Sequence, residues 1–232
     1  MKVSVILPTY NERENIEKLV REVEAAAPWE IIVVDDDSPD GTWQVVEKLA
    51  GELGNLKLIR RVGRRGLASA IAEGVSVAVG DVLVWMDCDG SMPPEKIPAL
   101  IRELERVDIA VGSRYVEGGG DRRPFSRALS SRLLNLFAAA LLRAGVRDYT
   151  TGFVAAKRKV FSEVEIEGDY GEYCINLLFH AFRKGFKIAE VPYMCVPREK
   201  GKSKTALGLA DLLKRGWSYG MAVLKLRLSS EK

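Results

Sequence analysis

The feature that most constrains the fold is a regular alternation of short apolar runs with longer amphipathic segments in the first half of the chain. The apolar runs are VSVIL, EIIVVD, LKLIR, VLVWMD and DIAVGS, and the segments between them cover residues 12–27, 42–53, 66–79 and 94–106. Apolar runs this short are typical of strands that are covered on both faces. Because strands and amphipathic helices alternate, the sequence predicts an α/β fold with a mostly parallel sheet flanked by helices.

The second half of the chain is less regular. Three glycines and a proline in EGGGDRRPFS, residues 117–126, interrupt all periodicity and predict a loop. Helices are expected at 126–144 and 172–184, with a strand near GFVAAK between them. We expect one α/β domain over residues 1–204, followed by a C-terminal amphipathic helix within residues 205–232.

The composition allows a full hydrophobic core and excludes several kinds of site. Of the 232 residues, 47% are hydrophobic, and the net charge of +3 is too small an imbalance to predict binding to nucleic acid. Cys88, Cys174 and Cys195 show no CxxC spacing, and the single histidine, His180, argues against most zinc chemistry. These counts predict a reduced, intracellular protein. No run reaches the ~20 apolar residues that a membrane span requires.

Acidic residues follow two of the predicted strands directly, as DDD at 35–37 and DCD at 87–89. In open α/β sheets, ligands bind beyond the carboxyl ends of the strands. Neighbouring carboxylates destabilise each other's charge unless a hard divalent cation neutralises them. A helix N-terminus stabilises about one such charge, by ~0.3–1 kcal/mol, so a base, a ribose or a cation better explains the others. We interpret Asn11 and Asp40 instead as helix caps.

Several motifs, taken together, resemble those of a known family. PTYNE, VVDDDSPDGT, MDCD before two prolines, GSRY before a glycine tract, SRLLN and VPYMCVPREKGKSK occur in this order. In order and spacing they are similar to the family 2 glycosyltransferases, and most similar to the dolichol-phosphate mannosyltransferase branch. The resemblance covers about residues 3 to 205. It implies a GT-A fold, a nucleotide-sugar donor, and Mg²⁺ or Mn²⁺ as a cofactor.

The resemblance also implies roles for individual residues, carried over position by position. The nucleotide-sugar-binding residues would be Pro8, Tyr10, Glu12, Val34, Asp36, Asp87, Cys88, Arg198 and Lys204. The metal ligands would be Asp87, Asp89 and Ser91, where Ser91 stands at a position that is Gln in many relatives. The catalytic residues would be Asp89, Arg114 and Arg132. The arginines and Lys204 match basic positions around phosphates, and an arginine fork suits phosphate oxygens.

The acceptor is suggested by a missing feature of the family. In sugar-transferring relatives an acidic pair precedes a late Gly-aromatic turn by about a dozen residues. Here that turn is Gly185-Phe186, and the corresponding stretch holds the single acid Glu172. A phosphate acceptor is already ionised near neutral pH and can attack without a general base, so the missing pair is consistent with a lipid phosphate. Glu172 as a general base remains an alternative.

The resemblance thus implies transfer of a hexose, in the first place mannose from GDP-mannose, to a polyprenyl (dolichyl) phosphate. Alternatives are a glucosyltransferase of the same lipid that uses UDP-glucose, a glycan-directed transferase, and a catalytically silent nucleotide-sugar-binding protein. A lipid acceptor requires contact with a membrane. The segment 126–147 fits an interfacial helix and a core helix equally well, whereas 205–228 is the better interfacial candidate. We therefore expect peripheral attachment at the cytoplasmic face, directly or through a membrane-anchoring partner protein.

Overall fold

The computed structural model describes residues 1–168, 171–201 and 209–229, with the backbone alone for 209–215. In this part of the chain the strands are β1 (Val3–Thr9), β2 (Glu30–Asp35), β3 (Leu56–Arg60), β4 (Val82–Trp85), β5 (Ile109–Ser113), β6 (Gly120–Asp121), β7 (Val154–Lys157), β8 (Ile188–Pro192) and β9 (Met194–Cys195). The helices are α1 (Ile16–Ala26), α2 (Thr42–Glu52), α3 (Leu67–Val77), α4 (Ile97–Glu103), α5 (Phe125–Leu142), α6 (Glu172–Arg183) and α7 (Leu209–Ser229), with short helical turns η1 (Pro94–Lys96) and η2 (Arg158–Ser162).

One sheet organises the molecule. Its strands lie in the order β3-β2-β1-β4-β7-β5-β8, and β6 pairs with β9 in a separate small sheet. β3, β2, β1 and β4 are parallel neighbours, whereas β7 runs antiparallel between β4 and β5. The predicted mostly parallel α/β sheet is confirmed. Since parallel strands end at the same edge, the loops that follow β1, β2, β3 and β4 are neighbours there.

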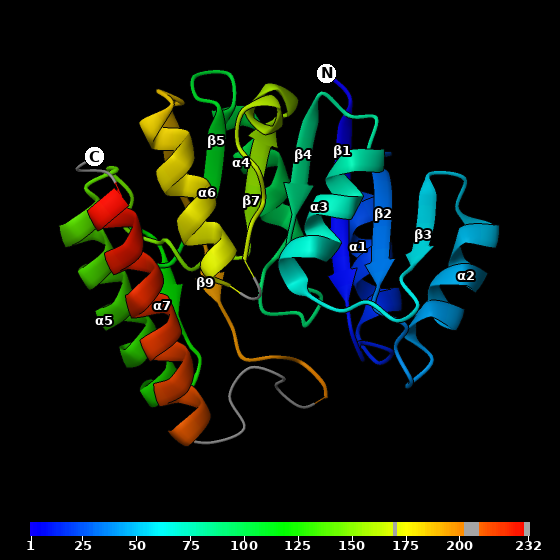
Figure 1. Ribbon diagram of the computed structural model, residues 1–232. Helices are drawn as coiled ribbons and strands as arrows, with labels where there is room; N and C mark the ends of the chain where they lie inside the picture. The colour runs from blue at the N-terminus through cyan, green and yellow to red at the C-terminus, as the bar shows by residue number, and fades with distance from the viewer. Residues whose placement is uncertain (169–170, 202–208, 230–232) are drawn as a thin grey trace.

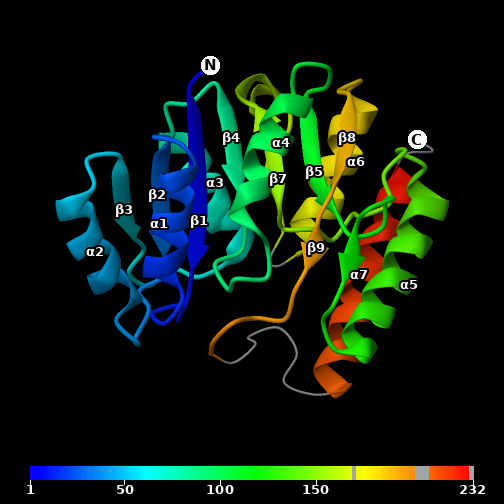
Figure 2. The ribbon, with the colours of Figure 1, turned by 180° about the vertical axis from the view of Figure 1, so that it is seen from behind.

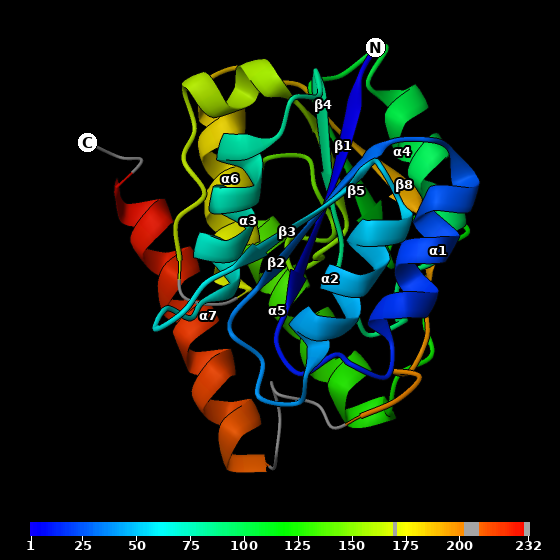
Figure 3. The ribbon, with the colours of Figure 1, turned by 90° about the vertical axis from the view of Figure 1, so that its right-hand side faces the viewer.

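Helices cover both faces of the sheet, as the view along its edge in Figure 3 shows. α3 and α6 lie on one face (Figure 1), and α1, α2 and α4 lie on the other (Figure 2). Side chains alternate along each strand, so Ile6 joins the core under α3 and α6 whereas Val5 and Leu7 join the core under α1, α2 and α4. Burial on both faces explains why β4 is a continuous apolar run and why β1 is mostly apolar.

α5 and α7 pack against each other at the end of the molecule opposite α2 (Figure 1). α5 matches the helix predicted at 126–144 to within two residues at each end, and α7 overlaps the helix predicted at 205–228. The proposed boundary at residue 204 falls outside the described residues, so the division into two parts stays a prediction. None of the described helices is long and apolar enough to cross a membrane.

The structure departs from the sequence prediction at the start of α1. This helix begins at Ile16, and Asn11 precedes it with a φ of 56°, so the interpretation of Asn11 as a helix cap is wrong. The backbone N–H of Asn11 instead donates to Ser38 Oγ at 2.9 Å and ties the β1 loop to the β2 loop. The N-cap residue of α2 is Gly41; Asp40 precedes it, and its Oδ1 accepts the N–H of Thr42 at 3.0 Å. The strands β6, β8 and β9 were not predicted.

Candidate functional site

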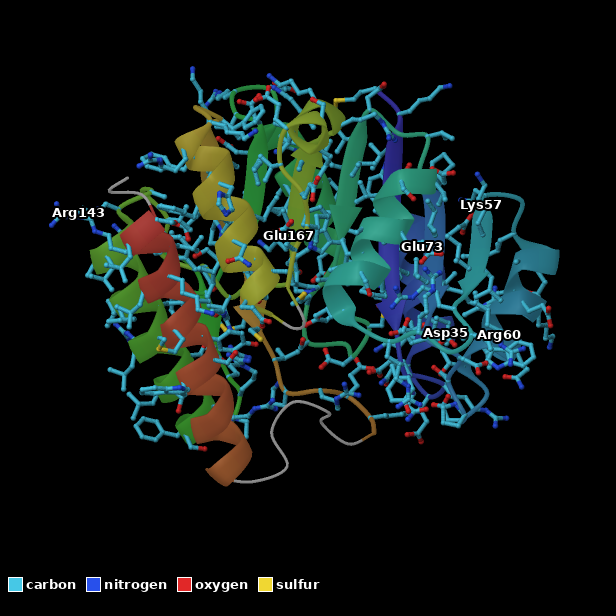
Figure 4. All side chains as sticks on the ribbon, viewed as in Figure 1. Asp35, Lys57, Arg60, Glu73, Arg143 and Glu167 are labelled. Carbon is cyan, nitrogen blue, oxygen red and sulfur yellow. The ribbon has the colours of Figure 1, made fainter. Side chains whose placement is uncertain are left out.

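The candidate site lies where β1, β2, β3 and β4 end. Figure 4 marks this edge of the sheet by Asp35 at the end of β2 and Arg60 at the end of β3. The segment that follows β9, residues 196–201, runs along the same edge (Figure 1). We call this segment the strap. We call the group of Tyr10, Glu12, Asp36, Asp87 and Asp89 the strand-end site, because each of these residues follows a strand at this edge.

Asp87 and Asp89 follow β4 after the buried Met86. The loop before β7 closes over Asp87, since a Cβ added at Gly152 would lie 2.9 Å from Asp87 Oδ1. Burial, together with the negative charges of Asp89 and Glu12, raises the pKa of Asp87 to about 7. Asp89 Oδ1 accepts the N–H of Ser91 at 3.1 Å. The site therefore holds three nearby carboxylates whose ionised forms a bound positive charge would stabilise.

The strap supplies one such charge. Arg198 binds Glu12 with both arms of its fork, from Nη1 to Oε2 and from Nη2 to Oε1 at 2.9 Å each. Its Nη2 also lies 3.3 Å from Asp89 Oδ2. Burial opposes its charge, but the carboxylates of Glu12 and Asp89 raise the pKa of Arg198. The backbone holds the strap in place as well, because Glu199 N–H donates to Asp89 O at 3.1 Å and Val196 N–H donates to Ser91 O at 3.2 Å.

Asp35 at the end of β2 and the two aspartates that follow it each have a partner within the protein. Asp35 is fully buried and accepts the hydroxyl of Thr9 at 2.8 Å and that of Ser38 at 2.6 Å. Asp37 accepts Arg60 Nε at 2.6 Å. Asp36 accepts Arg61 Nε at 2.6 Å and the N–H of Gly66 at 2.9 Å. The repulsion among these charges is thus relieved by arginines and hydroxyls from neighbouring elements, which the local sequence does not reveal.

Arg114, predicted to stabilise phosphate charge, is buried at the end of β5 and bound to another side chain. Its Nε and Nη2 donate to Asp148 at 2.8 and 2.6 Å, and its backbone N–H donates to Asp148 Oδ2 at 3.0 Å. Nη2 also donates to Thr150 Oγ1 at 2.9 Å. Burial opposes the charge, but Asp148 holds the pKa of Arg114 well above its usual range. Arg114 therefore fixes the 148–152 loop, which carries Gly152 against Asp87; its catalytic role stays a prediction.

Two arginines that the motif comparison did not select contribute charge to the site. Arg123 lies between β6 and α5, pairs with Asp121 through Nε at 2.9 Å, and its charge lowers the pKa of Asp87. Burial and the positive charges of Arg123 and Arg198 lower the pKa of Arg127 in the first turn of α5. The basic cluster in DRRPFSR was the available signal. Arg132, which the comparison did select, is exposed on α5.

The other predicted residues differ in what they present to a ligand. The side chains of Pro8, Val34 and Cys88 are buried, and Pro8 and Val34 are paired across β1 and β2. Ser91 is buried beneath the strap. Tyr10 is half-buried, and the guanidinium of Arg65 lies over its ring, 4.3 Å from the centroid. Lys204 lies outside the described residues.

The donor set at Asp87 and Asp89 fits a divalent cation that has oxygen ligands of other origin. Within the described chain no group of three or more His, Cys, Asp or Glu residues is arranged to enclose a metal ion. Mg²⁺ characteristically binds through one or two carboxylates together with substrate phosphates and water. The raised pKa of Asp87 also indicates that the site favours a gain of positive charge. Both features suit a cation that is shared with a bound diphosphate.

Comparison with known proteins decides the family. The sequence profile described as "Glycosyl transferase family 2" matches residues 4–165, which include the whole strand-end site but not the strap. The chain belongs to glycosyl transferase family 2. The resemblance noted in the motifs is therefore confirmed.

Two relatives named for an enzyme activity are similar in sequence over most of this chain. It is 42% identical over 212 residues to the dolichol-phosphate mannosyltransferase of Pyrococcus furiosus, covering 88% of this chain and 59% of that protein. It is 39% identical over 210 residues to the polyprenol monophosphomannose synthase of Mycolicibacterium smegmatis, covering 86% of this chain and 79% of that protein. The chain thus spans less than two thirds of the length of the Pyrococcus relative.

Solved structures confirm the fold. Glucosyl-3-phosphoglycerate synthase from Mycobacterium tuberculosis, in complex with Mn²⁺, uridine diphosphate and phosphoglyceric acid, matches with a TM-score of 0.76 and 22% identity. The match covers 97% of this chain and 78% of that one. The same enzyme in complex with Mg²⁺ and uridine diphosphate matches with a TM-score of 0.71. The predicted GT-A fold, a mostly parallel sheet between helical layers, is confirmed.

Proposed function

We propose that this chain is an inverting, metal-dependent glycosyltransferase that transfers mannose from GDP-mannose to a polyprenyl phosphate. The observation that carries the proposal is its identity of 34–42%, over 86–90% of its length, to proteins named for mannosyl transfer to polyprenyl carriers. The strand-end site and the strap support it, because together they place carboxylates beside Arg198 where α/β folds bind ligands. The non-enzyme alternative is disfavoured, since both acids of the DCD motif are present.

On the donor side, the carboxylates would bind the cation and the strap would bind the diphosphate. Asp87 and Asp89 would hold the divalent cation, which when bound neutralises charge on the departing nucleoside diphosphate. Arg198 is placed to meet the diphosphate, since its fork already lies beside Asp89 and suits phosphate oxygens. Tyr10, Glu12 and Asp36 would face the nucleoside. Glu12 already binds Arg198 and Asp36 already binds Arg61. Each acid would therefore contact the donor while it keeps its arginine, or would release that arginine.

On the acceptor side, the basic pair Arg123 and Arg127 supports a phosphate nucleophile. Burial lowers the pKa of Arg127, and the positive charges of Arg123 and Arg198 lower it further. A phosphate would relieve the repulsion among these charges and would be held close to the donor. A phosphate monoester carries about −1.5 to −2 charges near pH 7, so its oxygen can attack the sugar carbon without a general base. Attack from the face opposite the diphosphate inverts the configuration of that carbon.

Contact with a membrane would bring the lipid to the site. The side of α5 that carries Phe125, Leu129, Leu133 and Leu136 is exposed, and Trp217 on the neighbouring α7 is exposed too. The first two turns of α5 also carry Arg127 and Arg132. Apolar side chains flanked by basic ones suit the headgroup region of a bilayer. We therefore place the α5–α7 pair on the membrane surface, and the three free, buried cysteines support its cytoplasmic face.

The test is a transfer assay with the full chain, Mn²⁺ and labelled GDP-mannose or UDP-glucose, with a polyprenyl phosphate as acceptor. The proposal expects lipid-linked label from GDP-mannose only, loss of the product with a chelator, and loss with Asp89→Asn. Asp81→Asn is the matched control, because Asp81 is exposed at the opposite end of β4. Transfer from UDP-glucose instead of GDP-mannose would overturn the donor assignment, and full activity of Asp89→Asn would overturn the site.

A further inference from the structure

The last residue of β3 and the loop that joins β3 to α3 carry four arginines, and one of them is bound differently from the others. Arg60 pairs with Asp37 and Arg61 pairs with Asp36. Arg64 donates to both oxygens of Glu73, at 2.9 and 2.8 Å. Arg65 is exposed, and within the described residues no carboxylate lies within ion-pair distance of it. Its guanidinium instead lies over the face of the Tyr10 ring.

The backbone around Arg65 is fixed by the residue that follows it. The N–H of Gly66 donates to Asp36 at 2.9 Å, and its carbonyl accepts Arg61 Nη2 at 2.9 Å. Gly66 has a φ of 143°, a conformation that favours glycine and turns the chain into α3. A rigid anchor thus presents the flexible arm of Arg65 at the end of β1, beside Tyr10. The position is set by the fold, and the donors of the guanidinium remain available to a ligand.

The chemistry of this position points to a nucleobase. Tyr10 offers an aromatic face on which a base can stack, and a base seated there would displace the guanidinium from the ring toward the edge of the base. An arginine fork matches the adjacent O6 and N7 acceptors of guanine, which is the commonest specific arginine–base contact. Uracil has a C–H group beside O4 and offers the fork one acceptor at that edge.

We propose that Arg65 binds the O6/N7 edge of guanine and thereby selects a guanosine diphosphate donor over a uridine diphosphate donor. The inference rests on the proposed function, because it takes the base to lie against Tyr10. It makes Arg65 a specificity-determining residue and assigns it no part in the transfer step.

The test is calorimetric binding to the full chain in the presence of Mn²⁺, with GDP, 7-deaza-GDP and UDP as probes. The 7-deaza analogue keeps O6 and loses the N7 acceptor. For wild type we expect 7-deaza-GDP to bind about tenfold more weakly than GDP, the lower part of the range for one bidentate pair. Arg65→Ala should bind GDP and 7-deaza-GDP alike, about tenfold more weakly than wild type binds GDP, and should bind UDP as wild type does. Arg64→Ala, an exposed arginine on the same loop, is the control and should match wild type.

The outcomes separate the inference from the function on which it rests. If Arg65→Ala binds GDP as tightly as wild type, or still discriminates against 7-deaza-GDP, the inference is overturned while the proposed donor stands. If wild type binds UDP and not GDP, or binds neither, the proposed donor and the inference both fail. An unchanged melting temperature of Arg65→Ala assigns any loss of affinity to the missing contact, as expected for an exposed side chain.

Discussion

Replacement of Asp148 by asparagine isolates the most deeply buried ion pair among the described residues. Asp148 is fully buried and accepts three hydrogen bonds from Arg114, which is itself 5% exposed. Asparagine keeps the size of the side chain and removes the charge, so it leaves no cavity. The other carboxylate recorded near the guanidinium is Asp121, at 3.8 Å from Nη1. Arg114 would then remain buried with one distant counter-ion.

The expected cost follows from that geometry. Removing one partner of a buried ion pair destabilises a protein by about 3–5 kcal/mol, because the remaining charge stays buried without compensation. For a chain of this size that loss lowers the melting temperature by roughly 6–20 °C. Asp37→Asn provides the control: it also removes a carboxylate from an arginine, but Asp37 and Arg60 are both more than a third exposed. Exposed pairs contribute ~0.2–1 kcal/mol.

Urea unfolding monitored by circular dichroism would measure both variants. A lower midpoint with an unchanged slope identifies a change in stability. If Asp148→Asn loses no more free energy of unfolding than Asp37→Asn, the reasoning is refuted, because Arg114 would then have found solvent or another partner at little cost.

Three further predictions concern the strap, the half-buried Asp108 and the exposed side of α5. Arg198→Gln should raise the affinity for Mn²⁺ without donor several-fold, since it frees Asp89 and Glu12, and should weaken GDP binding; calorimetry showing unchanged Mn²⁺ affinity would contradict this. Burial opposes ionisation of Asp108, but Lys159 and the N–H of Lys187 lower its pKa. The ionised carboxylate therefore stabilises the fold above the unfolded pKa of ~4, and this contribution is lost as the pH falls. In urea unfolding, Asp108→Asn should lose less free energy of unfolding than wild type between pH 5 and pH 3, and parallel pH curves would refute the contribution. Leu133→Glu/Leu136→Glu should reduce sedimentation with anionic vesicles, whereas Val62→Glu/Val79→Glu, equally exposed but outside α5 and α7, should not; equal loss in both would argue against the α5–α7 face.

The fold was predictable where a local pattern determines it. β4 was recognised because a strand buried on both faces must be apolar at every position, and its four residues are all buried. The antiparallel insertion of β7 was not, because an apolar run carries no information on strand direction. β6 and β9 are two residues long each, too short for a period of two to be visible.

The acidic residues of the site were predictable from the sequence, and its arginines were less so. Asp87 and Asp89 are adjacent to a strand end, so their position follows from the sheet. The partner of Glu12 is Arg198, 186 residues away, and no local pattern encodes a contact at that separation. The choice between Arg127 and Arg132 depends on which side of α5 faces the acids, and that is set by packing against α7. The role of Asp148 follows from burial that the sequence DYTTG does not display.

If the nucleophile is a lipid phosphate, the enzyme should distinguish a polyprenyl phosphate from the uncharged alcohol of the same lipid. The full chain is incubated with Mn²⁺, GDP-mannose and either a polyprenyl phosphate or the matching polyprenol of the same length, and the lipid products are identified by mass spectrometry. We expect a mannosylated polyprenyl phosphate, and no mannosylated polyprenol, because the described site provides arginines for a phosphate whereas an alcohol requires a general base. Mannose on the polyprenol at a comparable rate, or on neither lipid, would show that the nucleophile is not a lipid phosphate.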